Sequence, residues 1–150
     1  MKKLDQIHKN LITILNKLRE TINNIEECKK NSSTKMLVFM DNDKLEQALH
    51  DSLLLRFKCC VDLFLYYLNQ YLELIIQMPP DFNGPKPVIR AALKAKLLSE
   101  ADTETLLKMI ESRNMTSHIY KEEIADQISA SIPMHYKIMH KYADSLTPQA

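Results

Sequence analysis

Apolar residues recur at steps of three and four along most of the chain, which is the spacing that places them on one face of an α-helix. The clearest run consists of Leu4, Ile7, Leu11, Ile14, Leu18, Ile22 and Ile25, separated by mostly polar residues. This run predicts an amphipathic helix over residues 4–25. The polar run KKNSSTK that follows favours a loop. For the short apolar stretch MLVFM after it, a strand-like lid, a helical turn and an oligomer contact all stay open, as does the role of residues 30–43.

A second and longer run predicts a central helix. Asp43 and Glu46, three residues apart, form a candidate capping box, in which each side chain pairs with the backbone N–H of the other residue. The apolar positions of this helix are Leu45, Leu49, Leu53, Phe57, Cys60, Phe64, Tyr67, Leu68, Tyr71 and Ile75. The sequence MPP ends the run, because proline does not continue a helix.

Prolines and capping residues divide the second half of the chain. DFNGPKP is a loop whose prolines lead into a short helix over about residues 88–98, because proline is tolerated only in the first turn. Ser99 or Asp102 can cap the next helix, which carries Leu106, Leu107, Met109 and Ile110. A last helix follows, with an expected kink at Pro133. Its predicted buried positions are Ile124, Ile128, Ile132, Tyr136, Met139 and Leu146.

The composition agrees with a chain made of helices. It has a single glycine, Gly84, whereas sheet proteins need turn residues at short intervals. With 150 residues, of which 45% are hydrophobic, the chain is long enough for one domain with a real core. We therefore expect an all-α fold, an up-and-down bundle of four to five helices, as a single domain over residues 1–150.

Charge, cysteines and hydropathy bear on the environment of the protein. The net charge of +1 creates no global field that would attract nucleic acid or lipid. Cys28, Cys59 and Cys60 are odd in number, and two are adjacent, so we expect buried thiols in a reducing compartment. No segment reaches the roughly 18 uninterrupted apolar residues of a membrane span, and the N-terminus lacks a secretion signal's apolar core. A cytoplasmic protein without membrane association is expected.

The stretch ESRNMTSHIY concentrates four side chains that can do chemistry: Arg113, Asn114, His118 and Tyr120. On a straight helix at about 100° per residue, Arg113 and Tyr120 share a face, with Asn114 and His118 stacked beside them. A guanidinium holds a phosphate through two parallel hydrogen bonds, and a histidine that titrates near neutrality can move a proton of the 2′-hydroxyl or of the leaving oxygen. The combination fits phosphoryl transfer on RNA if a second copy of the chain supplies a second histidine.

From the spacing alone, a structural role for this stretch is favoured, because short motifs match by accident. Arg113 would then pair with Glu111 or Glu122, and His118 would satisfy the carbonyl groups of a helix end. The charge of the region gives weak support to RNA binding: residues 84–121 carry seven cations and four acids, hence +3, and the rest of the chain sums to −2. Solvated helix faces explain this balance equally well.

Other candidate sites are weaker. His135 and His140 do not share a helical face and have no further ligand at a suitable spacing, so no metal site is expected. With one glycine the chain has no phosphate-binding loop, and no cofactor is expected. Tyr66, Tyr67 and Tyr71 have core spacing, which indicates packing or dimer contacts.

The residues around the motif carry a resemblance to a known family. RNMTSHIY has the order arginine, four residues, histidine, one residue, tyrosine; PKPVIRAALKAKLLSEADTETLLKMIE precedes it and EEIADQI follows it. With LRFKCCVDLFLYYLNQYL, these segments resemble the HEPN superfamily in its HepT-like branch, also called nucleotidyltransferase substrate-binding proteins, most clearly over residues 45–146. The chain departs from that family at Lys58, Leu65, Tyr66 and Lys86, which leaves the motif intact and bears on partner choice.

The resemblance implies a homodimeric helical bundle that is a HepT-like toxin of a type VII toxin–antitoxin pair. Such a toxin is a metal-independent ribonuclease, and its composite site would use Arg113 and His118 of both chains, supported by Asn114. Its partner is a minimal nucleotidyltransferase, the antitoxin, which in some pairs transfers AMP to the motif tyrosine, here Tyr120. An alternative is a non-catalytic substrate-binding subunit of a nucleotidyltransferase, and a third possibility is a helical scaffold without a ligand.

Overall fold

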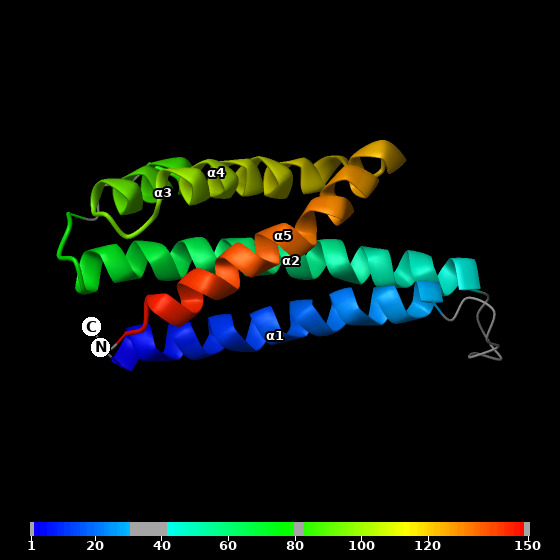
Figure 1. The fold of residues 1–150 in the computed structure, drawn as a ribbon, viewed down its shortest axis with the longest axis horizontal. Coiled ribbons are helices and arrows are strands. Elements are labelled where there is room, and N and C mark those ends of the chain that lie inside the picture. The colour runs from blue at the N-terminus through cyan, green and yellow to red at the C-terminus, as the bar shows by residue number, and fades with distance from the viewer. Residues whose placement is uncertain (1, 31–41, 80–82, 149–150) are drawn as a thin grey trace.

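Helices make up nearly all of the described residues, which are 2–30, 42–79 and 83–148 of a computed structural model (Figure 1). The elements are α1 (Lys2–Lys30), α2 (Asn42–Leu74), α3 (Pro85–Lys94), α4 (Glu100–Asn114), the 3-10 helix η1 (Met115–His118) and α5 (Glu122–Ser145). No strand occurs within these ranges. The predicted all-α bundle is confirmed. The stretch MLVFM and the side chain of Asp43, and with it the capping box, lie outside the described residues.

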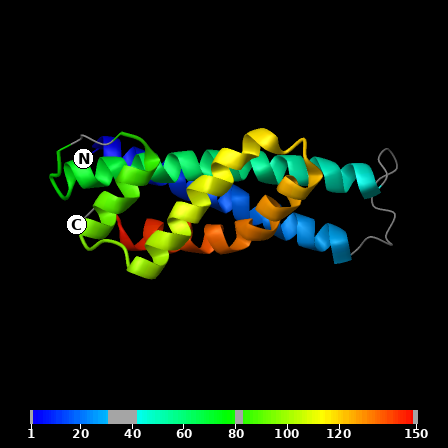
Figure 2. The same cartoon turned by 90° about the horizontal axis from the view of Figure 1, so that it is seen from above.

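The five α-helices form an up-and-down bundle around α2. In Figure 1, α1 and α2 run antiparallel side by side, α3 and α4 lie along the other side of α2, and α5 returns diagonally from the end of α4 toward the start of α1. Figure 2 shows the same order from above, with the first and last helices starting and ending at one end of the molecule. Every other α-helix packs against α2, which makes α2 the shared core element.

The predicted apolar stripes face this core with small shifts. On α1, Leu4, Leu11 and Leu18 are fully buried, as predicted. Leu15 and Thr21 are buried as well, whereas the predicted Ile14 and Ile22 are only partly buried. The Thr21 hydroxyl accepts a hydrogen bond from Nη1 of Arg56 at 2.7 Å and donates one to the Lys17 carbonyl at 2.9 Å, so this polar group is buried with partners.

The short third helix begins and ends earlier than the predicted 88–98. It begins at Pro85 because proline already has the φ angle of a first helical residue, and Gly84 before it adopts φ 98°, which is left-handed. It ends at Lys94 because Lys96 adopts φ 63°. The N–H groups of Lys96 and Leu97 then donate to the carbonyls of Leu93 and Ala92, which closes the helix end in a Schellman motif.

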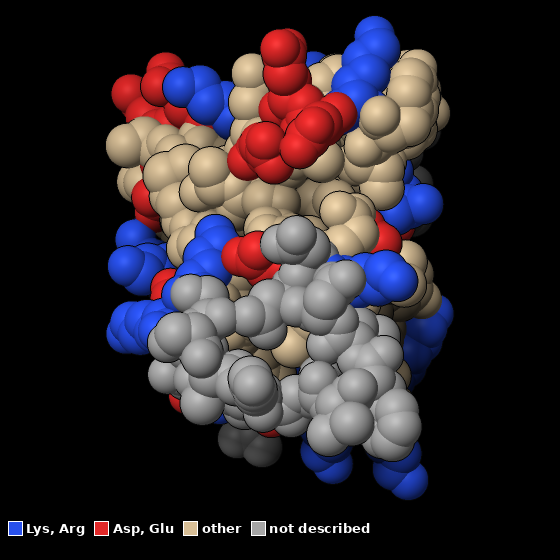
Figure 3. Space-filling model, turned by 90° about the vertical axis from the view of Figure 1, so that its right-hand side faces the viewer, with Lys and Arg blue, Asp and Glu red and all other residues tan. Residues whose placement is uncertain are grey.

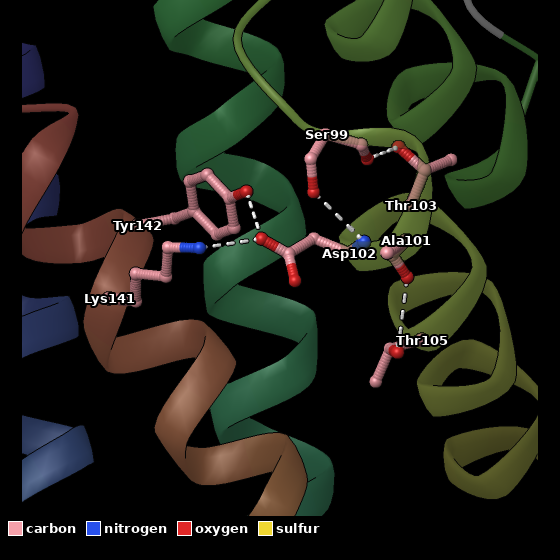
Figure 4. A network of polar contacts seen from close by, with 7 residues as sticks. All are labelled: Ser99, Ala101, Asp102, Thr103, Thr105, Lys141 and Tyr142. Atoms are coloured by element: carbon pink, nitrogen blue, oxygen red, sulfur yellow. Dashed lines mark hydrogen bonds and ion pairs between the residues drawn. The ribbon is translucent and has the colours of Figure 1, made fainter.

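A polar network fastens the start of α4 to the end of α5 (Figure 4). Ser99 caps α4, accepting a hydrogen bond from the Asp102 backbone N–H at 3.1 Å, as predicted for one of two candidates. The Asp102 carboxylate accepts hydrogen bonds from Nζ of Lys141, at 2.7 Å, and from the hydroxyl of Tyr142. The hydrogen bond from Lys141 is the main reason that the pKa of Asp102 lies below its usual value. This network fixes the direction in which α4 carries the motif.

The cysteines differ in exposure, contrary to the prediction that all are buried. Cys60 is buried, Cys28 is partly buried and Cys59 is exposed. Adjacent residues on a helix point about 100° apart, so only one member of the Cys59–Cys60 pair can face the core. In the described part of the chain, no helix is both long and apolar enough to span a bilayer.

His135 is a buried polar residue that the hydrophobic pattern did not predict. It is 2% exposed and its ring stacks on Phe57, with 5.8 Å between centroids and 20° between planes. Neither ring nitrogen has a hydrogen-bond partner among the described residues, and burial lowers the pKa of His135. The folded protein therefore holds this imidazole in its neutral form.

Acidification should destabilise the fold through His135. Because its folded pKa lies below its unfolded value of about 6.5, only the unfolded chain takes up a proton as the pH falls through that value. The free energy of unfolding should then fall by at most about 1.4 kcal/mol per pH unit, whereas above pH 7 this residue contributes no pH dependence. Urea unfolding of His135→Leu between pH 7.5 and 5.5 should show a weaker pH dependence than wild type. The control His50→Leu, at a partly exposed position, should keep the wild-type slope; equal slopes for all three proteins would contradict the assignment.

Candidate functional site

The backbone of the motif is not a straight helix. α4 ends at Asn114, and the chain tightens into η1 before the turn that leads to α5. The hydroxyl of Thr116 donates to the Arg113 carbonyl at 2.7 Å, and that of Ser117 donates to the Asn114 carbonyl at 3.1 Å. These bonds serve carbonyl groups at the helix end. The angles expected for a straight helix are therefore wrong from Met115 onward.

Arg113 is held by a residue that is 51 positions away in the sequence. Its Nε donates to Oδ1 of Asp62 at 2.7 Å and its Nη2 donates to Oδ2 at 2.9 Å. This two-point contact fixes the plane of the guanidinium as well as its position. The hydrogen bonds to Asp62 are the main cause that raises the pKa of Arg113. Arg113 is thus pinned to the middle of α2.

The contact with Asp62 leaves the other edge of the guanidinium available. A guanidinium can bind oxyanions on its Nε/Nη2 edge or on its Nη1/Nη2 edge. Asp62 occupies the first edge, and Nη1 contacts no acceptor in the described part of the chain. The Arg113 side chain is 28% exposed. It can therefore bind a phosphate through its second edge without releasing Asp62.

The other motif side chains lie on the surface. Asn114, His118 and Tyr120 all reach solvent, Tyr120 to 76%. Nδ1 of His118 lies 3.4 Å from the hydroxyl of Tyr120, a long contact, and the two rings meet edge to face. The structure thus brings His118 and Tyr120 together, while Arg113 turns toward α2. These polar groups are open to a ligand.

The structural explanation considered for the motif fails in its details. Glu111, a proposed partner of Arg113, lies 3.6 Å from Nζ of Lys86, and Arg113 itself pairs with Asp62 in place of Glu111 or Glu122. The ring of His118 contacts Tyr120, and no carbonyl group within the described ranges accepts a hydrogen bond from it. A helix end that needed these side chains for capping would engage them locally.

Asp62 was not predicted from the sequence as part of the site. It is the only charged residue between Cys59 and Leu68, a stretch that is otherwise apolar or tyrosine. A lone carboxylate in such a stretch was a signal that could have been noticed, because an acid seldom lies among apolar residues without a partner. Its partner could not be read from the sequence, since it depends on how α4 packs against α2.

A groove begins beside the motif and runs between three helices. It has a volume of about 970 Å³ and lies between the second half of α1, the first half of α2 and the first half of α5. Ile119 and Tyr120 form part of its wall, whereas Arg113, Asn114 and His118 do not line it. No cluster of three or more potential metal ligands occurs among the residues described. The motif therefore borders two different surfaces.

The fold occurs in solved structures of other proteins. A protein of Thermus thermophilus aligns with a TM-score of 0.64 and 22% identity over 86% of this chain and 98% of that one. A Haemophilus influenzae protein, described as having the fold of a substrate binding domain of a nucleotidyltransferase, aligns with a TM-score of 0.62 and 22% identity over 88% and 98%. A structure described as a toxin–antitoxin with AMP-PNP aligns with a TM-score of 0.61 and 16% identity over 91% and 97%.

The family follows from the sequence. The family model for nucleotidyltransferase substrate binding protein like sequences matches residues 7–147, nearly the whole chain. No curated protein sequence gives a significant match. The chain belongs to the nucleotidyltransferase substrate binding protein like family.

Removing Asp62 should free Arg113 without unfolding the protein. In Asp62→Ala the guanidinium loses both hydrogen bonds, so its Nε–H resonance should shift and exchange faster with water. Because the pair is partly exposed, the free energy of unfolding should change by less than about 1 kcal/mol. Arginine side-chain NMR and urea unfolding measure the two effects. The control Glu111→Ala removes a different acid of α4, the one that pairs with Lys86, and should leave the Arg113 resonance in place. An unchanged Nε–H signal in Asp62→Ala would contradict the contact between Arg113 and Asp62.

Proposed function

We propose that this chain is a HepT-like HEPN toxin, a homodimeric, metal-independent ribonuclease of a type VII toxin–antitoxin pair. The observation that supports it best is the state of Arg113: Asp62 orients it, and its second edge is free to bind a phosphate. Asn114 and His118 follow Arg113 in the chain, and both side chains are exposed to solvent. Among the described residues, neither side chain caps the helix end with a hydrogen bond. The whole chain, residues 1–150, would act as one HEPN-like domain.

In this proposal the residues divide the work of cleaving a phosphodiester. The 2′-oxygen of RNA attacks the adjacent phosphorus, the bond to the 5′-oxygen breaks, and a 2′,3′-cyclic phosphate forms. One histidine accepts the proton of the 2′-hydroxyl and another gives a proton to the leaving 5′-oxygen. Arg113 stabilises the negative charge on the phosphorane oxygens, with Asn114 in support. Since each chain has one His118, the two histidines come from two copies.

A surface beside Arg113 supports dimerisation. Leu55, Cys59, Asp62 and Tyr66 follow at steps of four, three and four on α2, so they share one exposed face. Leu55 is 62% exposed and Tyr66 is 42% exposed, although both are large and mainly apolar. A second copy packed on this face would cover them and would bring the two Arg113 side chains close together.

The ribonuclease activity would be regulated through Tyr120. The partner nucleotidyltransferase would transfer AMP from ATP: the Tyr120 oxygen attacks the α-phosphorus, pyrophosphate leaves, and the phenolic proton passes to a base. The hydroxyl of Tyr120 lies 3.4 Å from Nδ1 of His118, on a ring that is largely exposed. An AMP group at this oxygen would put a phosphate and a nucleoside against the proposed catalytic histidine, so it would exclude RNA by volume and by charge.

A second candidate function is a non-catalytic subunit that presents a substrate to a nucleotidyltransferase. The Haemophilus influenzae neighbour, described as the fold of such a substrate binding domain, favours it. In that case Arg113 and Asn114 would hold a nucleotide or a partner without chemistry. The two functions differ in whether the isolated dimer cleaves RNA.

The isolated protein should cleave single-stranded RNA in EDTA, and His118→Ala should lower the rate by about 10²- to 10⁴-fold because one proton transfer is lost at each site. His140→Ala is the matched control, because His140 is also on the surface, where it pairs with Asp144 at 3.4 Å. It should keep wild-type activity. A fully active His118→Ala protein would exclude the proposed chemistry, and a folded wild-type dimer without activity would favour the binding subunit.

Co-expression with a nucleotidyltransferase encoded beside this chain should add one or more AMP groups, seen by intact mass, and should abolish RNA cleavage. Tyr120→Phe removes the only proposed acceptor oxygen, so its mass should stay unmodified and its activity should persist. Tyr66→Phe, at another exposed tyrosine, should be modified like the wild type. AMP addition to Tyr120→Phe would show that the acceptor lies elsewhere.

A further inference from the structure

The groove beside Tyr120 differs in character from the motif. In Figure 1 the C-terminal half of α5 lies against α1, whereas the first half of α5 runs toward the end of α4 and so diverges from α1 and α2. The space left between the three helices is the groove of about 970 Å³. Along α5 it extends from Glu122 to Pro133, which is about 17 Å at the rise of an α-helix, and Ile119 and Tyr120 line it before that helix begins.

The floor of the groove is apolar. Ile25, Leu53 and Leu54, which are buried, contribute to it from α1 and α2, and Ala125 and Pro133 contribute from α5. A groove with such a floor and a length of about three helical turns suits the apolar face of an amphipathic helix.

The rim of the groove is acidic. Its charged residues are five acids, Glu26, Glu46, Asp51, Glu122 and Asp126, and one lysine, Lys29, so the formal charge is −4 while the whole chain carries +1. Asp51 accepts a hydrogen bond from Nε2 of Gln47 at 3.1 Å. The ion pairs of Asp62, Asp102, Glu111 and Asp144 lie outside the groove lining. Figure 3 looks onto the end of the molecule where α1 ends and α2 begins; acidic side chains gather at the top of this face, and Lys and Arg lie beside them and along the sides.

We propose that this groove is a docking site for a cationic amphipathic helix of a protein partner. The apolar floor would take the hydrophobic stripe of that helix, and the five carboxylates would pair with lysine or arginine side chains along its edges. The negative rim disfavours a nucleic-acid backbone, so this surface is distinct from the proposed RNA-binding motif. The inference does not rest on ribonuclease activity, since none of its residues is Arg113 or His118.

Tyr120 connects the groove with the motif. It forms part of the groove wall, and its hydroxyl lies near His118. A helix seated in the groove would contact this 76% exposed ring and cover it. Docking would therefore place the partner beside Tyr120. The chemical reactivity of the Tyr120 ring would then show whether a helix occupies the groove.

The probe for this site is a 14-residue peptide of lysine and leucine whose order gives one apolar helical face. Its control is a scrambled peptide of the same composition without that face. Titration of the full chain, followed by backbone NMR, should shift resonances within residues 22–29, 46–54 and 119–133 for the amphipathic peptide only. Nitration of Tyr120 by tetranitromethane should be slowed by the same peptide, while nitration of Tyr136, which is partly exposed and does not line the groove, should not. Equal binding of the scrambled peptide, or shifts spread over other surfaces, would overturn the proposal.

Charge-neutral variants test the rim. Glu46→Gln, Asp51→Asn, Glu122→Gln and Asp126→Asn in one protein should weaken peptide binding about tenfold or more, because four of the five carboxylates are lost. The matched control changes four acids outside the groove, Glu20, Glu73, Glu100 and Glu104, to glutamine and should bind like wild type. Equal weakening in both variants would show attraction by net charge alone. Two other results would contradict the assigned occupant: a single-stranded RNA that shifts the groove resonances, or a second copy of the chain that already fills the groove and blocks the peptide.

Discussion

The packing of four helices against α2 is the constraint on which the rest of the structure depends. α2 is the longest helix, and its residues Phe57, Cys60, Val61 and Phe64 are almost completely buried. Because α1, α3, α4 and α5 all contact it, each of them is positioned against the same helix. A change in the register of α2 would therefore move the core and the motif together.

The position of Arg113 in the motif depends on that packing. Arg113 is at the end of α4, where a long side chain would be free to adopt many rotamers. The packing of α4 on α2 brings it against Asp62, and two hydrogen bonds fix it. At the other end of α4, Asp102 accepts hydrogen bonds from Lys141 and Tyr142, which hold the start of α4 against α5. An arginine fixed in this way can bind a phosphate at a lower entropic cost.

Arg113 and the groove have opposite electrostatic character. On one side Arg113 presents a free edge of its guanidinium, which suits an anion. On the other side the groove carries five carboxylates and one lysine, which suits a cation. Such a separation is invisible in the net charge of +1, because the opposite charges cancel in the sum.

The sequence by itself determined the elements and the identity of the motif. The spacing of Leu4, Leu11 and Leu18, and of Phe57, Phe64 and Tyr71, requires helices that bury one face, because few other structures place residues at steps of three and four together. The hydrogen-bonding needs of a helix start indicated Ser99 or Asp102 as the cap, and the structure has Ser99 in that role.

Only the tertiary structure decided which of these residues meet. The contact between Arg113 and Asp62, the burial of His135 against Phe57 and the acidic rim of the groove each join residues of different helices. Helical periodicity describes one helix at a time, so it gives neither the crossing of α5 nor the partner of a charge on another helix. The end of α4 at Asn114 was also hidden, since Thr116 and Ser117 can either continue a helix or tighten it.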